Sequence, residues 1–162
     1  PAKFIYDKEG LAELSYFWGD LYKIKGKCRP DWLSKDGNTV VDLKTTQDAS
    51  PKGFQKSISG FGYHIQAAWY LRGLRNLDVP AKEFIFIAIE KTAPFCIGVY
   101  RADEDMINAG MSEVHKSLEV INMCQETKLY PDYTPTIQDI SLPPWMTNKK
   151  VTPQNYQEIE LY

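Results

Sequence analysis

The chain has 162 residues, of which 43% are hydrophobic and 25% are charged, and its formal net charge is −2. This composition is typical of a soluble globular protein of one domain, and the charge excludes a protein that coats nucleic acid by bulk charge. Cys28, Cys96 and Cys124 lack C-x-x-C spacing, which excludes a zinc or iron–sulfur site built from cysteine alone. No apolar stretch reaches the length of a membrane span, so we expect a cytoplasmic protein with reduced thiols and no membrane partner.

The first half of the chain predicts three β-strands, at residues 13–18, 23–32 and 39–45, with a hairpin turn at 35–38 before the third. Because successive side chains of a strand point to opposite faces, the middle strand has one charged face. That face carries Lys23, Lys25, Lys27, Arg29 and Asp31. Pro30 cannot donate a ladder hydrogen bond, so we expect a bulge, an edge or a strand end there.

The second half of the chain predicts three helices and two strands. Ser50 and Pro51 are typical of a helix start. The helices are expected at residues 51–58, 63–74 and 103–126, and the strands at 83–90 and 95–100. Residues 127–162 are rich in proline and aromatic residues, and we expect an extended tail over the domain or a neighbouring subunit. This order of elements indicates an α/β or α+β fold with a mixed central sheet flanked by helices.

Two carboxylates and a lysine on neighbouring strands have the layout that metal-dependent phosphodiester hydrolysis needs. Asp42 and Lys44 share a face of the third strand, whereas Val41 and Leu43 point the other way, into the core. Divalent cations prefer oxygen ligands, so the candidates are Asp31, Asp42 and the backbone carbonyl of Leu43. Lys44 would orient the attacking water or stabilise developing negative charge. Same-face ion pairs are common on exposed strands, but the apolar residues before Asp42 indicate a partly buried strand, where a charge needs a partner or a metal.

Gln66 and Tyr70 are four residues apart on the helix predicted at 63–74 and therefore share a face. They are candidates for contacts beside the active site or a DNA strand, although periodicity alone favours an aromatic face packed on the sheet. Lys27 and Arg29 are candidates for contacts to DNA phosphates, and a solvated edge strand explains the basic stripe about as well.

Three segments occur in order along the chain: Gly-Lys-Cys-Arg-Pro-Asp at 26–31, Val-Asp-Leu-Lys-Thr-Thr-Gln-Asp-Ala-Ser-Pro at 41–51 and Gly-Tyr-His-Ile-Gln-Ala-Ala-Trp-Tyr at 62–70. This combination resembles the RecE-like (exonuclease VIII) branch of the PD-(D/E)XK nucleases, which is related to RecB-type nuclease domains. The resemblance implies a restriction-endonuclease-like core in a single nuclease domain over residues 1–162. By motif match it implies metal ligands at Asp31 and Asp42, a catalytic lysine at Lys44, an accessory helix pair at Gln66 and Tyr70, and an outer acidic ligand at Glu13.

The same resemblance implies a Mg²⁺- or Mn²⁺-dependent exonuclease that digests double-stranded DNA ends from 5′ to 3′ in phage or prophage recombination. It also implies a single-strand annealing protein as partner, a ring-shaped homo-oligomer, and the cytoplasm of a bacterial or phage-infected host cell. The family usually carries a metal-associated histidine upstream of the first aspartate, and no histidine precedes Asp31. We therefore expect either that an N-terminal part is missing or that the site uses fewer ligands. A catalytically impaired DNA-binding module and an endonuclease are the alternatives.

Overall fold

The computed structural model describes residues 9–19, 22–134 and 136–147. The chain separates into two compact units, residues 1–129 and residues 130–162. The strands of the first unit are β1 (Gly10–Ala12), β2 (Tyr16–Gly19), β3 (Lys25–Cys28), β4 (Trp32–Ser34), β5 (Thr39–Thr46), β6 (Glu83–Glu90) and β7 (Ile97–Arg101). Its helices among the described residues are α2 (Pro51–Phe61), α3 (Tyr63–Arg75) and α4 (Glu104–Thr127).

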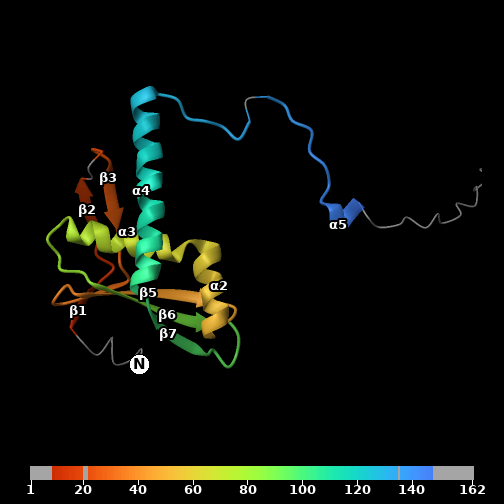
Figure 1. The fold of residues 1–162 in the computed structure, drawn as a ribbon. Helices are drawn as coiled ribbons and strands as arrows, with labels where there is room; N and C mark the ends of the chain where they lie inside the picture. The colour runs from red at the N-terminus through yellow and green to blue at the C-terminus, as the bar shows by residue number, and fades with distance from the viewer. Residues whose placement is uncertain (1–8, 20–21, 135, 148–162) are drawn as a thin grey trace, which may run out of the picture. The chain divides into compact units, whose positions relative to one another are not determined.

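Five of these strands form one mixed sheet in the order β1-β4-β5-β6-β7 (Figure 1). β5 and β6 run parallel, and the other neighbouring pairs of this sheet run antiparallel. A parallel pair needs a crossover connection, and α2 and α3 supply it between β5 and β6. The predicted mixed central sheet flanked by helices is confirmed.

The main core lies between this sheet and the helices on one of its faces (Figure 1). Its most deeply buried side chains, each at most 1% exposed, include Val40 from β5, Phe54 from α2, Leu71 from α3, and Phe84 and Phe86 from β6. α4 packs against α3 so closely that a side chain at Gly110 would collide with the backbone of His64. α3 is therefore held between the sheet and α4, which fixes the helix that covers β5.

α2 begins as predicted but ends later. The Ser50 hydroxyl accepts a hydrogen bond from the backbone N–H of Gly53, and Pro51 opens the helix. The predicted end at residue 58 was wrong, since the helix continues to Phe61. Gly62 then adopts a left-handed conformation with φ of 68°, which glycine tolerates best, and α3 starts at Tyr63.

The charged run predicted as one strand at 23–32 is divided between two sheets. β3 pairs with β2 in a separate two-stranded sheet, whereas β4 pairs with β1 and β5 in the large sheet. Buried Pro30 lies at the break, where it has no N–H to offer either ladder. The strand predicted at 13–18 also differs, because Glu13 has a φ of 56° and separates β1 from β2.

The opposite face of the large sheet holds a smaller buried cluster of Trp32, Val41 and Ile87. Val41 is buried there, as predicted. The prediction that Leu43 also points into a core was wrong, because its side chain is 44% exposed. Leu43 and Val41 share one face of β5 by alternation, so burial on this face decreases toward the carboxyl end of the strand.

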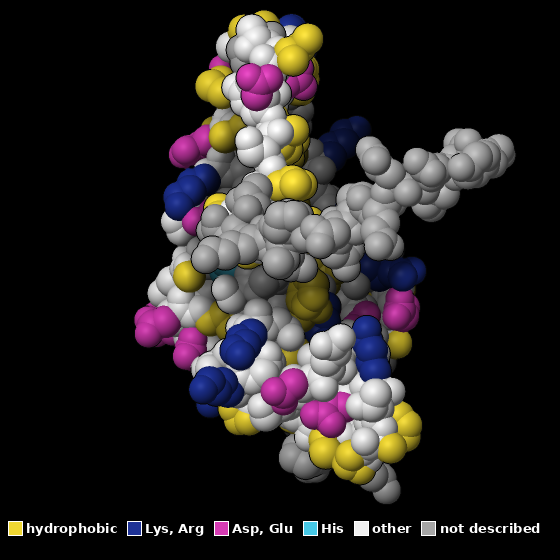
Figure 2. Space-filling model, turned by 90° about the vertical axis from the view of Figure 1, so that its right-hand side faces the viewer, with side chains coloured by type: hydrophobic (Ala, Val, Ile, Leu, Met, Phe, Trp, Pro, Cys, Tyr) yellow, Lys and Arg dark blue, Asp and Glu magenta, His cyan; other side chains and the backbone are white. Residues whose placement is uncertain are grey.

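The surface of the first unit carries no field of one sign on the side seen in Figure 2. Lys and Arg side chains are interspersed there with Asp and Glu side chains. At the top of that view, the end of α4 shows apolar side chains, and Val120, Ile121 and Met123 are exposed in this half of the helix. The charges on this side are therefore mixed, in line with the small net charge of −2 of the whole chain.

The second unit contains most of the predicted tail. Its described residues include the short helix α5 (Pro144–Thr147) and lack other helices and strands. Residues 148–162 of the predicted tail lie outside the described residues. Within the described part of the chain, no helix is both long enough and apolar enough to cross a membrane.

Candidate active site

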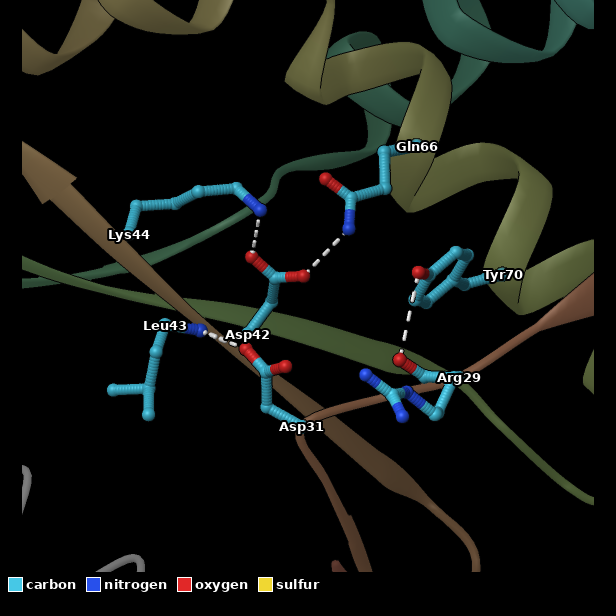
Figure 3. Close-up of polar contacts among 7 residues, drawn as sticks. All are labelled: Arg29, Asp31, Asp42, Leu43, Lys44, Gln66 and Tyr70. Atoms are coloured by element: carbon cyan, nitrogen blue, oxygen red, sulfur yellow. Dashed lines mark hydrogen bonds and ion pairs between the residues drawn. The ribbon is translucent and has the colours of Figure 1, made fainter. Parts of the chain in front are cut away.

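The predicted site centres on Asp42, which lies on β5 and faces α3 (Figure 3). Because strand side chains alternate, Asp42 and Lys44 both face the helices and Leu43 faces away. Asp42 is only 2% exposed. Its Oδ1 accepts a 2.6 Å hydrogen bond from Nε2 of Gln66 on α3, and its Oδ2 forms an ion pair with Nζ of Lys44.

Asp31 reaches the same part of β5 from the segment between β3 and β4. In the antiparallel β4–β5 pair, Trp32 lies opposite Val41, which brings the preceding residue close to Asp42. Oδ2 of Asp31 accepts a 2.6 Å hydrogen bond from the backbone N–H of Leu43 (Figure 3). The hairpin expected from the sequence thus brings together both aspartates and the lysine.

Burial governs the electrostatics of this group. It raises the pKa of the Asp42 carboxyl, while the hydrogen bonds from Lys44 and Gln66 and the charge of Lys44 oppose that rise, and the charge of Asp31 adds to it. The side chain of Lys44 is 15% exposed, and its Nζ lies 4.7 Å from the centre of the Tyr63 ring. A buried charge is costly unless it is paired, so the ion pair and the ring together hold Lys44 beside Asp42.

The donor set fits a hard divalent cation that keeps part of its water shell. Oδ2 of Asp42 is buried, and its described partner is the ammonium of Lys44. No group of three or more His, Cys, Asp and Glu side chains able to hold a metal occurs among the described residues. Mg²⁺ commonly binds through one or two carboxylates, water and substrate phosphates, so two aspartates suffice for it. The negative charge of Asp31 raises the pKa of Asp42, and a bound cation would relieve this repulsion.

The predicted helix pair Gln66 and Tyr70 divides between two roles. Gln66 contacts the Asp42 carboxylate directly, although periodicity favoured an aromatic packing face for this part of the helix. The hydroxyl of Tyr70 instead lies 3.5 Å from the backbone carbonyl oxygen of Arg29, and its ring packs edge-on against Phe84. Tyr70 therefore contacts the segment that leads into Asp31 rather than either carboxylate (Figure 3).

The remaining predicted residues lie on the surface beside this group. Nε of Arg29 forms a 3.1 Å ion pair with Glu13, and both side chains are more than half exposed. Glu13 does not form a metal-holding group with Asp31 and Asp42 among the described residues, and its role as an outer ligand stays a prediction. Lys27 is exposed, while its backbone carbonyl accepts a 3.1 Å hydrogen bond from Nε1 of Trp69 on α3.

Tyr63 contacts the site lysine but is not among the predicted site residues. It lies under the ammonium of Lys44, and its ring stacks with that of Phe86 in the core at 6.2 Å between centres. The available signal was its position three residues before Gln66, which puts the two side chains on one helix face. The packing of Tyr63 on the core gives Lys44 a fixed aromatic surface beside the carboxylate.

Comparisons with known proteins agree with this architecture. Residues 2–142 match the family model described as "PDDEXK-like domain of unknown function (DUF3799)". No curated protein matches the chain. The solved structure of a protein from Eubacterium rectale, named "Putative exonuclease", is similar with a TM-score of 0.68 and 16% identity. The match covers 93% of this chain, which spans 61% of the length of that protein. A second structure, named SSO0001, has a TM-score of 0.42 and 17% identity over 64% of this chain and 48% of its own.

Proposed function

The chain belongs to the PDDEXK-like domain family, and on that premise we propose that it is a metal-dependent deoxyribonuclease. The observation that carries the proposal is the buried pair of Asp42 and Lys44 with Asp31 beside it. Burying such charges costs stability, and replacing a buried ion pair by well-packed apolar residues is often neutral or stabilising. A charged group kept there at that cost is typical of a functional site.

The two aspartates would hold a divalent cation, most simply Mg²⁺ or Mn²⁺, with the backbone carbonyl of Leu43 as a further oxygen donor. Such a cation, when bound, supplies charge neutralisation at the phosphate and acidifies water at neutral pH. Gln66 fixes the orientation of the Asp42 carboxylate through its hydrogen bond to Oδ1. Lys44 places a positive charge where negative charge develops on the phosphate or where the attacking water lies.

The finer assignment is an exonuclease that acts on double-stranded DNA ends, from 5′ to 3′, in phage or prophage recombination. The order of the three sequence segments supports this assignment. The name "Putative exonuclease" of the Eubacterium rectale protein, which is similar in fold, supports only its exonuclease part. Exposed Lys27 and Arg29, close in sequence to Asp31, would contact backbone phosphates and position the strand. A ring-shaped homo-oligomer, a single-strand annealing partner and a bacterial or phage-infected host cytoplasm belong to the same proposal.

Linear and closed-circular duplex DNA distinguish the candidate activities. Each is incubated with the protein in Mg²⁺, in Mn²⁺ and in excess chelator, and the products are resolved by gel electrophoresis. Loss of only the linear DNA, and only with metal, is the expected result. Cutting of the circle would replace the exonuclease by an endonuclease. Binding of DNA without cleavage under all conditions would contradict the nuclease and leave a DNA-binding module on the same fold.

A further inference from the structure

A second feature beside the site is an open cavity of about 630 Å³ at the carboxyl end of β5. Residues 45–48, which end and follow the strand, form one wall, and α2 forms another with Lys56 and Ser57. The lining also includes Phe61, Tyr63 and Lys91. Lys44 directly precedes the lining residue Thr45 in the chain, and it contacts the lining residue Tyr63. The cavity therefore opens next to the proposed cleavage site.

An exposed aromatic side chain stands at this cavity. Phe61 is 74% exposed, and its ring stacks with that of Tyr63 at 5.6 Å between centres and 27° between planes. Tyr63 is anchored by Phe54 and Phe86 in the core, and Lys44 lies 4.7 Å from its ring centre. The site lysine and the exposed ring are thus linked through one fixed aromatic residue.

The charges of the cavity favour a ligand that has both a phosphate group and an apolar part. Lys56 and Lys91 contribute two positive charges, and Asp48 contributes one negative charge. Hydrogen bonds from Ser50 lower the pKa of Asp48, with a further contribution from the nearby charge of Lys56. The remaining excess is one positive charge next to an apolar ring, a combination that suits a nucleotide better than a free anion.

We propose that Phe61, stacked on Tyr63, is a platform for an unpaired nucleobase of the DNA strand that enters the site, with the adjoining phosphates facing Lys56 and Lys91. Every base has an aromatic face, so such a platform binds single-stranded DNA without reading its sequence. The substrate form recognised next to the site is then a splayed or single-stranded end rather than a fully paired duplex. This inference rests on the proposed function, because it takes DNA as the substrate.

The test uses DNA duplexes that carry a three-nucleotide single-stranded extension, on either the 5′ or the 3′ strand, with 2-aminopurine in the extension. Binding is measured in chelator, where a metal-dependent nuclease cannot cut, by anisotropy and by quenching of 2-aminopurine fluorescence. We expect quenching with the wild-type protein and with Phe61→Trp. Phe61→Ala should lose the quenching and bind about tenfold more weakly, the loss expected for one base–aromatic stack.

Leu77→Ala is the matched control, since Leu77 is also an exposed apolar residue, at 38%, just past the other end of α3. With a rise of 1.5 Å per residue, α3 separates it from Phe61 by about 20 Å, and this variant should bind as the wild type does. Lys56→Gln and Lys91→Gln should each reduce the slope of log affinity against log salt by about 0.7. Lys82→Gln, an exposed lysine outside the cavity, should leave the slope unchanged.

The possible outcomes test the stacking role of Phe61 separately from the proposed nuclease activity. Quenching that depends on Phe61, in a protein that never cleaves DNA in Mg²⁺, would keep the platform and contradict the nuclease. Cleavage in Mg²⁺ with equal binding and equal quenching by wild type and Phe61→Ala would overturn the platform and keep the nuclease. A wild-type protein that fails to bind any of these duplexes overturns the platform as well.

Discussion

On β5, a charged side chain is buried on one face and an apolar side chain is exposed on the other. On the face toward α3, the charged Asp42 is 2% exposed, whereas on the other face the adjacent apolar Leu43 is 44% exposed. Burial of apolar area stabilises a fold and burial of charge opposes it, so neither residue is placed for stability. The comparison suggests that the covered face carries activity at a cost in stability, and that changes on the two faces should separate the two properties.

The largest effect should come from the covered face. Lys44→Met removes the charge beside Asp42 while keeping an aliphatic stem, and we expect cleavage to slow by about 10²–10³-fold, as when one preorganised charge donor is lost. Single-turnover cleavage of linear duplex in Mg²⁺ measures this rate. The control is Lys82→Met, an exposed lysine before β6, which should keep the wild-type rate. A Lys44→Met protein as fast as the control would remove Lys44 from the mechanism.

The second effect should come from the opposite face and concern stability alone. Ile87→Ala empties a position that is 1% exposed in the cluster with Trp32 and Val41, at a cost of about 2–5 kcal/mol. Leu43→Ala should cost less than about 1 kcal/mol, because its side chain already meets solvent. Urea unfolding measures both values. Equal costs at the two positions would show that Leu43 is covered in solution, for example by another chain.

The third effect is a pH dependence specific to Asp42. Its pKa in the folded protein is raised above the ordinary value of 3.8, so the folded state binds more protons than the unfolded state in the window between the two values. The contribution of Asp42 to stability therefore falls as pH rises through that window. Asp42→Asn lacks this titration, so in chelator its stability relative to wild type should increase from pH 4 upward. A relative stability that stays constant or decreases would mean that the ion pair with Lys44 outweighs burial.

The smallest effect should come from the exposed basic residues. Lys27→Gln removes one candidate phosphate contact, so we expect severalfold weaker binding of duplex DNA and a salt slope reduced by about 0.9. Anisotropy titrations in chelator at several salt concentrations measure both. Lys82→Gln again serves as the control. Identical slopes for the two variants would show that the basic face with Lys27 and Arg29 is a solvated strand edge and does not contact DNA phosphates.

Local patterns were enough to predict the central elements. Alternation along residues 39–45 indicated β5 and placed Asp42 with Lys44, and Ser50-Pro51 marked the start of α2. The run at 23–32 was predicted as one strand because its alternation continues through Arg29, Pro30 and Asp31. In the structure, β3 pairs with β2, whereas β4 pairs with β1 and β5. The alternation of residues along the run does not indicate which strand each half pairs with.

The proximity of the candidate site residues was predictable, and their surroundings were less so. Asp31, Asp42 and Lys44 followed from strand pairing and the hairpin, whereas the contact of Gln66 with Asp42 depends on how α3 lies across the sheet. The exposure of Leu43 could not be predicted for a related reason. An apolar residue two positions from a buried one lies on the same face of the strand and is expected to be buried. Whether it is depends on which other elements cover that part of the face.

The most direct test of the central claim compares wild type with Asp42→Asn, a change that keeps the shape and the capacity to accept a hydrogen bond from Gln66. Both proteins are incubated with linear duplex DNA over a range of Mg²⁺ concentrations, and circular dichroism checks that both are folded. We expect metal-dependent cleavage by the wild type and none detectable by the folded variant. Cleavage by Asp42→Asn at the wild-type rate would contradict a site built on Asp31, Asp42 and Lys44.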